Sequence, residues 1–260
     1  MKIGFIGCGN LALSVIEGMI KYHAAESQDI YFYSADCEDT KKNIVDKYHI
    51  QSMDSNAKVV EQCQIIFLAI KPNVLLSVLD EIKECNLQEK IFISVVAGMV
   101  VSEIKKHLNH DKVLRMMPNI LGSVGEGMFV FAQDTALACE LEQAEELLQK
   151  IGKTLQIDEK QLAAVTAISG SAPAYVFMFI EALAQGGIRE GIAQQAAYDI
   201  AVQVVLGSAK MAAESDKHPA QLRDMVCSPA GTTIEAVASL QQDGFSHAVM
   251  NAVKKCANKA

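Results

Sequence analysis

The sequence predicts an α/β protein whose first part is a doubly wound, mainly parallel sheet and whose second part is an all-helical domain. Up to about residue 157, short apolar runs alternate with amphipathic stretches of helix length, which is the pattern of βαβ units. From residue 158 onward the strand-like runs stop and only helical stretches remain. We therefore expect two domains, residues 1–157 and residues 158–260.

Each element follows from its local pattern. Several strand-like runs are apolar throughout, which is typical of strands covered by helices on both faces of a sheet. The expected strands are Lys2–Gly7, Ile30–Ser34, Ile65–Ala69, Ile91–Val95, Val113–Met116, Met128–Ala132 and Thr154–Ile157. The expected helices of the first domain are Leu11–Tyr22, Asp39–Tyr48, Ala57–Cys63, Asn73–Cys85, Val101–His107 and Glu140–Ile151. Those of the second domain are Glu159–Ile168, Ala174–Arg189, Ala193–Glu214, Pro219–Met225, Thr233–Gln242 and Phe245–Ala257.

Two helices of the second domain are apolar around most of their circumference, at Val176–Ala184 and at Ile200–Leu206. A helix that is apolar on all sides must be buried on all sides. A domain of about a hundred residues buries too little surface to achieve this alone. We therefore expect the helical domain to form the core of a homodimer, or of a larger homo-oligomer built from dimers. Packing of these helices against the chain's own sheet is the alternative.

Composition argues against several classes of function. The formal net charge is −8 and Lys and Arg are not clustered, so no nucleic-acid surface is expected. The densest apolar run, Ala172–Ile180, is shorter than the roughly 20 residues of a membrane-spanning helix. The seven cysteines contain no C-x-x-C pair and the chain shows no secretion signal. We expect no membrane segment, no metal site, and free thiols in a cytoplasmic protein.

A glycine motif, Gly7-Cys8-Gly9-Asn10-Leu11-Ala12, follows the first expected strand and opens the first expected helix. Gly7 permits a tight turn, Gly9 lets the backbone approach a pyrophosphate, and Ala12 allows close packing of helix on sheet. The helix N-terminus would present free N–H groups to the phosphates. This strand–turn–helix context predicts a Rossmann domain that binds a dinucleotide.

The end of the second strand bears on the choice between NADH and NADPH. An acid there binds the ribose hydroxyls, whereas a small or basic residue admits the 2′-phosphate. The strand ends at Tyr33-Ser34 without an acid, but Asp36 and Glu38 follow, and the pair Lys41-Lys42 could reach back. The residues leave both cofactors open.

Two further stretches carry candidate substrate residues. Arg115–Asn119 follows a strand and leads into Gly122–Gly127, where either substrate contact or a plain glycine-rich turn with a surface ion pair between Arg115 and Glu126 is possible. Cys227–Thr233 joins two helices and ends in hydroxyl-bearing residues. That loop could form an anion pocket, but on local sequence alone plain helix capping is the favoured interpretation.

The sequence resembles the pyrroline-5-carboxylate reductases, the last enzymes of proline biosynthesis, nearly end to end. The resemblance rests on Ile3–Asn10, on Ala69–Pro72, on Met117–Asn119, on Ser169–Tyr175, on His218–Leu222 and, most specifically, on Asp224–Ile234. It implies a Rossmann domain followed by a helical domain that interlocks with its twin. It also implies hydride transfer from NADPH or NADH to the C=N carbon of L-1-pyrroline-5-carboxylate, giving L-proline.

The resemblance further implies the roles of individual residues. Thr233 would be catalytic, with its hydroxyl near the ring nitrogen, and Ser228, Gly231, Thr232 and Thr233 would hold the substrate carboxylate. The cofactor residues would be Ile6, Gly7, Cys8, Gly9, Asn10, Leu11, Ser34, Asn56, Ala69, Ile70, Lys71, Pro72, Val95, Val96 and Ala97. A protonated cyclic imine is already electrophilic, so the cofactor supplies the chemistry and no strong general acid is required. We expect the dimer to complete each site.

Three departures from the family pattern bear on the substrate. Ala172 and Ala230 replace glycines, and Ile120-Leu121 stands where Thr-Pro often follows the asparagine. Alanine is acceptable unless the backbone needs a positive φ. A related reductase of another imine or of a keto acid is one alternative. A dimer without catalysis is another, although neither the glycine turn nor Thr232-Thr233 is damaged.

Overall fold

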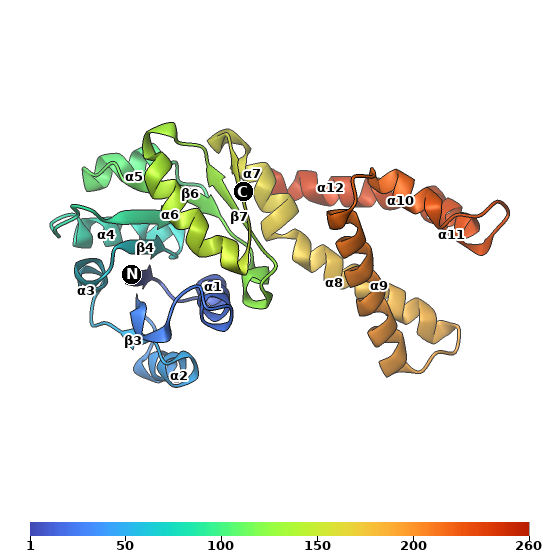
Figure 1. Ribbon diagram of the computed structural model, residues 1–260, viewed down its shortest axis with the longest axis horizontal. Helices are drawn as coiled ribbons and strands as arrows, with labels where there is room; N and C mark the ends of the chain where they lie inside the picture. The colour runs from blue at the N-terminus through green and yellow to red at the C-terminus, as the bar shows by residue number, and fades with distance from the viewer. Residues whose placement is uncertain (260) are drawn as a thin grey trace. The chain divides into compact units, whose positions relative to one another are not determined.

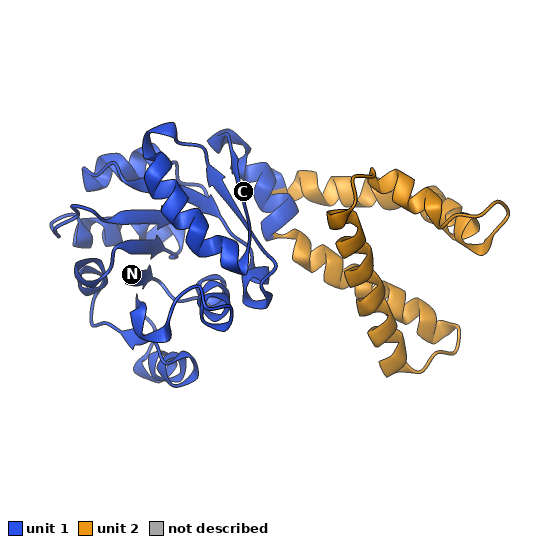
Figure 2. Ribbon diagram, in the orientation of Figure 1, with its two compact units in different colours: residues 1–170, 257–260 blue, residues 171–256 orange. Residues whose placement is uncertain are grey.

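The computed structural model describes residues 1–259 and divides them into two compact units. Unit 1 comprises residues 1–170 and 257–259, and unit 2 comprises Ser171–Cys256 (Figure 2). The sequence predicts a domain boundary at residue 157, whereas unit 1 continues to Gly170. The difference arises because Leu162 and Val165 pack on the sheet with Val130 and Ala132.

Unit 1 is built on a single sheet that lies among its helices (Figure 1), and the strands of this sheet follow the order β3-β2-β1-β4-β5-β6-β7-β8. All neighbouring strands run parallel except β6 and β7. The strands are β1 (Ile3–Ile6), β2 (Ile30–Tyr33), β3 (Gln51–Ser52), β4 (Ile65–Leu68), β5 (Ile91–Ser94), β6 (Val113–Met117), β7 (Gly127–Ala132) and β8 (Gly152–Ile157). The predicted strands are confirmed within a few residues at each end, and the two-residue β3 was missed because it is too short to show a pattern.

Helices cover both faces of this sheet, as the uniformly apolar strands predict. One face packs against α1 (Asn10–Lys21), α2 (Glu38–Tyr48) and α6 (Ala138–Leu148). The other face packs against α3 (Asn56–Gln62), α4 (Pro72–Ile82) and α5 (Val101–Leu108). The short α7 (Leu162–Val165) lies on β6 and β7, between 3-10 turns at Glu159–Gln161 and a π-helical turn at Thr166–Gly170.

The strand order reverses between β1 and β4, because the chain moves outward from β1 to β3 and then returns to the other side of β1. Such a reversal separates the crossover helices and opens a crevice at the carboxyl ends of the strands, where ligands bind in doubly wound folds. The G-x-G-x-x-A turn follows β1 and so lies at this point.

Unit 2 consists of α8 (Ala172–Arg189), α9 (Gln194–Glu214), α10 (Pro219–Met225), α11 (Thr232–Gln242) and α12 (Phe245–Ala257). Ala184, Ala197 and Ala201 form its small buried cluster between α8 and α9. Many large apolar side chains stay exposed, including Met178 at 68% and Leu206 at 58%. A helical unit with so little buried apolar surface needs a further covering surface to be stable.

One helical stretch bears on the expectation of no membrane segment. The helical stretch Glu159–Arg189 is 31 residues long, and 18 consecutive residues within it have a mean hydropathy of 1.6, so by length and composition alone it could cross a membrane. The densest apolar run within it, Ala172–Ile180, is shorter than a membrane-spanning helix, and the core helix of a soluble protein meets the same criterion of length and composition.

Candidate active site

Backbone pairing aligns the predicted cofactor residues along one edge of the sheet in unit 1. Ile6 on β1 is level with Tyr33 on β2 and with Leu68 on β4, and Leu68 is level with Ser94 on β5. The residues that follow these four strand ends are Gly7, Ser34, Ala69 and Val95. The structure therefore brings together four predicted segments that are far apart in the sequence.

The glycine turn fits a dinucleotide. Gly7 has a φ of +89°, and a side chain there would collide with the carbonyl oxygen of Ala69. A side chain on Gly9, by contrast, would meet no atom within 4 Å, so the backbone faces open space. Helix α1 begins after Gly9 without a side-chain cap, which leaves its first N–H groups available to an anion.

The other predicted cofactor residues differ in exposure. Lys71 precedes α4 and is exposed together with Pro72 and Ala97, whereas Val96 is buried. Asn56 is 5% exposed, and its amide nitrogen donates to Glu81 at 2.6 Å. Glu81 also accepts the backbone N–H of Asn56 at 3.1 Å. Glu81 thereby holds Asn56 at the start of α3; sequence analysis missed this contact because α4 meets α3 only in the folded sheet.

Cys8 lies within the turn but is not reactive. Burial, and secondarily the negative charge of Asp36, raise the pKa of the Cys8 thiol to about 12. A thiol that stays protonated is a poor nucleophile. The structure assigns Cys8 to packing beside the cofactor segment.

In unit 2, the Cys227–Thr233 loop does not cap the following helix as the local sequence suggested. Helix α11 begins at Thr232 after Gly231, and no side chain caps it. The Gly231 N–H donates instead to the Ser228 carbonyl oxygen at 3.0 Å. The favoured capping interpretation of Ser228, Thr232 and Thr233 is therefore wrong, and the first N–H groups of an 11-residue helix remain available to a carboxylate.

Two residues fix the shape of this loop. A side chain on Gly231 would meet the Ser228 hydroxyl, which would have to rotate out of its present position. Ala230 has a φ of +55°, a left-handed backbone that favours glycine. The condition under which alanine is not acceptable, a positive φ, is therefore met at Ala230, and the loop stores a small strain.

His218 caps helix α10, as its place before Pro219 predicts. The ring Nδ1 of His218 accepts the backbone N–H of Ala220 at 3.2 Å, and the backbone N–H of His218 donates to Oε1 of Gln221 at 3.0 Å. This reciprocal pair is a capping box, so the ring is engaged in structure and not in proton transfer.

The segment that follows β6 is structural. Asn119 is 4% exposed, and its side-chain oxygen accepts the N–H groups of Leu121 and Met128 at 3.2 Å each. These bonds close the turn between β6 and β7, which favours the glycine-turn interpretation of Gly122–Gly127. The Ile120-Leu121 departure lies within this turn.

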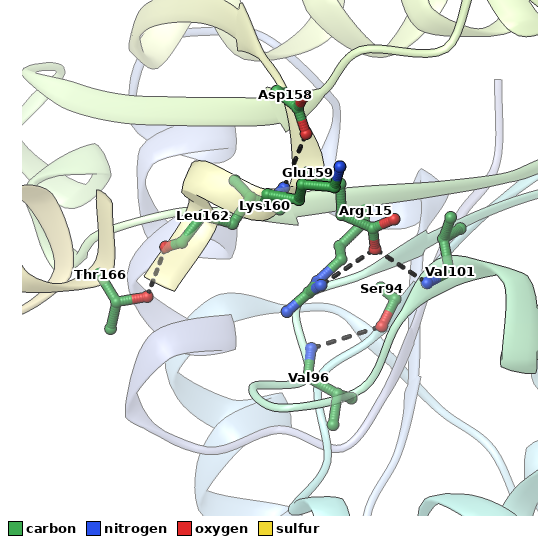
Figure 3. A network of polar contacts seen from close by, with 9 residues as sticks. All are labelled: Ser94, Val96, Val101, Arg115, Asp158, Glu159, Lys160, Leu162 and Thr166. Carbon is green, nitrogen blue, oxygen red and sulfur yellow. Dashed lines mark hydrogen bonds and ion pairs between the residues drawn. The ribbon is translucent and has the colours of Figure 1, made fainter. Parts of the chain in front are cut away.

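Arg115 on β6 forms an ion pair, but not with Glu126. Its Nη1 donates to Glu159 at 2.9 Å, and the same carboxylate accepts the N–H of Val101 at 2.9 Å (Figure 3). The Arg115 side chain is only 11% exposed, and its buried Nε has no partner. Glu126 is exposed. Sequence analysis missed Glu159 because it lies 44 residues from Arg115.

A hollow of about 540 Å³ adjoins this ion pair within unit 1. It is lined by Gly98, Val100, Ser102, Arg115, Asp158, Glu159, Lys160 and Ala163. The ion pair between Arg115 and Glu159 connects β6 with the residues that lead into α7. The Glu159 contact with Val101 ties the end of the loop after β5 to both.

Comparisons with known proteins bear on both units. A family sequence model described as pyrroline-5-carboxylate reductase dimerisation matches residues 159–260, and one described as NADP oxidoreductase, coenzyme F420-dependent, matches residues 2–98. The chain is 38% identical to the pyrroline-5-carboxylate reductase of Escherichia coli, over all of this chain and 97% of that protein. It is 39% identical to that of Methanosarcina acetivorans, over all of this chain and 96% of that protein.

Solved structures agree with these relatives. The Plasmodium falciparum pyrroline carboxylate reductase with NADP bound has a TM-score of 0.88 at 30% identity, over all of this chain and 96% of that one. The reductase of Streptococcus pyogenes has a TM-score of 0.86 at 29% identity, over all of this chain and 97% of that one.

Proposed function

The chain belongs to the pyrroline-5-carboxylate reductase family, and from this premise we propose that it reduces L-1-pyrroline-5-carboxylate to L-proline. The cofactor is a reduced nicotinamide dinucleotide, NADPH or NADH, which supplies the hydride when bound. The single observation that carries the proposal is that the two predicted ligand segments both end in helix N-termini without a side-chain cap, at α1 and at α11.

The residues of unit 1 hold the dinucleotide. The open backbone at Gly9 and the first N–H groups of α1 bind the pyrophosphate, because phosphates bind where a helix dipole and free N–H groups converge. The loop Val95–Ala97 at the end of β5 orients the nicotinamide half, and the Arg115–Glu159 pair ties the end of the loop after β5 to β6 through Val101.

The residues of unit 2 hold the substrate. The first N–H groups of α11, with the Ser228 and Thr232 hydroxyls, bind the carboxylate of the imine. The Thr233 hydroxyl bonds the ring nitrogen and orients the C=N bond. Positioning of donor and acceptor accounts for most of the catalysis, because a protonated imine accepts hydride without further activation.

A second copy of the chain completes the enzyme. The exposed apolar side chains of α8 and α9 lie in the region matched by the dimerisation model, and a homodimer covers them. The apolar stretch Glu159–Arg189 then lies in a protein core and not in a lipid bilayer. All seven cysteines are free thiols, which supports a cytoplasmic location.

Replacing Thr233 tests the proposed substrate role. We expect Thr233→Ala to lower kcat by about 10- to 100-fold, the effect of losing one hydrogen bond made in the transition state. The Kd of the dinucleotide should stay nearly unchanged, because Thr233 lies outside the cofactor segments. Thr233→Ser keeps the hydroxyl and should restore most of the rate.

The measurement is a steady-state assay with L-1-pyrroline-5-carboxylate, another cyclic imine and a keto acid, each with both cofactors. An equal loss of cofactor binding in Thr233→Ala would sink the assignment of Thr233. Turnover of the keto acid but not of pyrroline-5-carboxylate would point to the related reductase instead.

A further inference from the structure

The end of β2 is held beside the glycine turn. Tyr33 is the last residue of β2, and its carbonyl oxygen accepts the N–H of Gly7 at 2.9 Å. Ser34 follows immediately and is 7% exposed. In Rossmann domains, the side chains at this place determine which cofactor binds: the one with a free 2′-hydroxyl on its adenosine ribose or the one with a 2′-phosphate there.

The hydroxyl of Ser34 is already engaged. It donates a hydrogen bond to Oδ2 of Asp36. A hydroxyl has one hydrogen to donate, so Ser34 cannot donate to a phosphate oxygen while this bond stands. The residue directly after β2 is Ser34 and not an acid. The bond from Ser34 holds the carboxylate of Asp36, two residues further on, beside the end of β2.

A second observation locates the Asp36 charge. Burial is the main cause of the raised pKa of Cys8, and the negative charge of Asp36 is the second. Cys8 lies in the glycine turn and Ser34 at the end of β2. The Asp36 carboxylate therefore lies at the end of β2, which contacts the adenosine ribose in this fold, and near the glycine turn, which contacts the pyrophosphate.

The nearby cations are offset by acids. Lys41 on α2 pairs with Glu38 at 2.7 Å and lies 5.4 Å from the centre of the Tyr33 ring. Between the end of β2 and the first turn of α2, three acids (Asp36, Glu38 and Asp39) stand against Lys41 and Lys42. The local negative charge therefore disfavours a 2′-phosphate on the adenosine ribose.

We propose that Asp36 determines cofactor specificity and makes NADH the preferred hydride donor. Its carboxylate accepts a hydrogen bond from the ribose 2′-hydroxyl of NADH. The 2′-phosphate of NADPH carries close to two negative charges and meets a like charge in the same place. This inference rests on the proposed function, because it assumes that the site holds a nicotinamide dinucleotide.

Direct binding tests the proposal without turnover. The chain has no tryptophan, so the fluorescence of the reduced nicotinamide, with calorimetry beside it, reports the Kd of the full-length protein for NADH and NADPH. We expect NADH to bind at least about tenfold more tightly, the effect of one favourable contact replaced by a like charge. Asp36→Asn keeps an acceptor for Ser34 and removes the charge. It should tighten NADPH binding about tenfold and weaken NADH binding several-fold.

Two variants serve as controls. Asp39→Asn makes the same change of charge three residues further on and should leave the ratio of the two Kd values unchanged. Lys41→Gln should also leave it unchanged, because Lys41 is paired with Glu38. A sharp loss of NADPH binding in Lys41→Gln would overturn the proposal, since that lysine would then read the 2′-phosphate.

The remaining outcomes separate this inference from the proposed function. Tighter binding of NADPH by the wild type, or a ratio unchanged in Asp36→Asn, overturns the inference alone if pyrroline-5-carboxylate is still reduced. Equal shifts in Asp36→Asn and Asp39→Asn overturn it as well, because general charge and not Asp36 would then be responsible. Failure to bind either dinucleotide overturns both.

Discussion

At the scale of single residues, the substrate loop contains a residue in a conformation that does not suit it. Ala230 has a φ of +55°, where the Cβ atom of an L-residue crowds the following carbonyl. Ala172, the other alanine that replaces a glycine of the family pattern, lies in the first turn of α8. The two departures therefore have opposite physical consequences.

We expect Ala230→Gly to stabilise the protein by about 0.5–1 kcal/mol, because relief of the left-handed strain exceeds the extra backbone entropy of glycine. Ala172→Gly should instead destabilise it by up to about 1 kcal/mol, because glycine disfavours a helix. Urea denaturation of both variants measures the difference. A destabilised Ala230→Gly would contradict the strain argument, and a changed KM for the imine would show that the loop shape also sets substrate affinity.

At the scale of elements, one largely buried ion pair joins three segments. Arg115 on β6 holds Glu159, which holds the N–H of Val101 at the start of α5. The pair is partly open to solvent on the glutamate side, where 29% of the side chain is exposed. Removing one partner leaves the guanidinium without its counter-charge in a poorly solvated place.

We expect Glu159→Gln to lower the free energy of unfolding by about 1–3 kcal/mol, because the buried guanidinium loses a charged partner. Glu126→Gln is the matched control, since Glu126 is exposed and should leave stability within about 0.5 kcal/mol. A double-mutant cycle with Arg115→Met isolates the pair. Additive effects in that cycle would show that the two side chains do not support each other.

At the scale of the whole molecule, the helical unit leaves its apolar side chains uncovered in a single chain. Leu206 on α9 is 58% exposed and belongs to a dense group of such residues. Leu76 on α4 in unit 1 is exposed to a similar extent, 52%, but it lies outside the region matched by the dimerisation model. Single exposed apolar residues are ordinary, whereas large apolar patches mark interfaces.

We expect Leu206→Glu to halve the mass in sedimentation or light scattering, because an unpaired charge buried in an interface costs several kcal/mol. Leu76→Glu introduces the same charge and should leave the dimer intact. Recovery of the wild-type chain with membranes, or a monomeric wild type, would contradict the dimer proposal and reopen the membrane interpretation of Glu159–Arg189.

The sequence by itself determined the fold class, the order of the elements and the dinucleotide turn. These depend on local patterns: apolar runs such as Ile65–Leu68 for buried strands, amphipathic periods for helices, and glycines at fixed spacing in Gly7-Cys8-Gly9. The motifs of the helical part were also sufficient to indicate the family. Such features are encoded within a few consecutive residues, so they can be read before the chain folds.

Only the tertiary structure decided how the side chains of the site are partnered. It assigned Arg115 to Glu159 and not to Glu126, engaged the Ser34 hydroxyl with Asp36, left α11 without a side-chain cap, and put Ala230 in a left-handed backbone. The physical reason is that hydrogen bonds and ion pairs form between atoms close in space, and a backbone angle depends on the loop that contains it. Neither is specified by residue type and spacing along the chain alone.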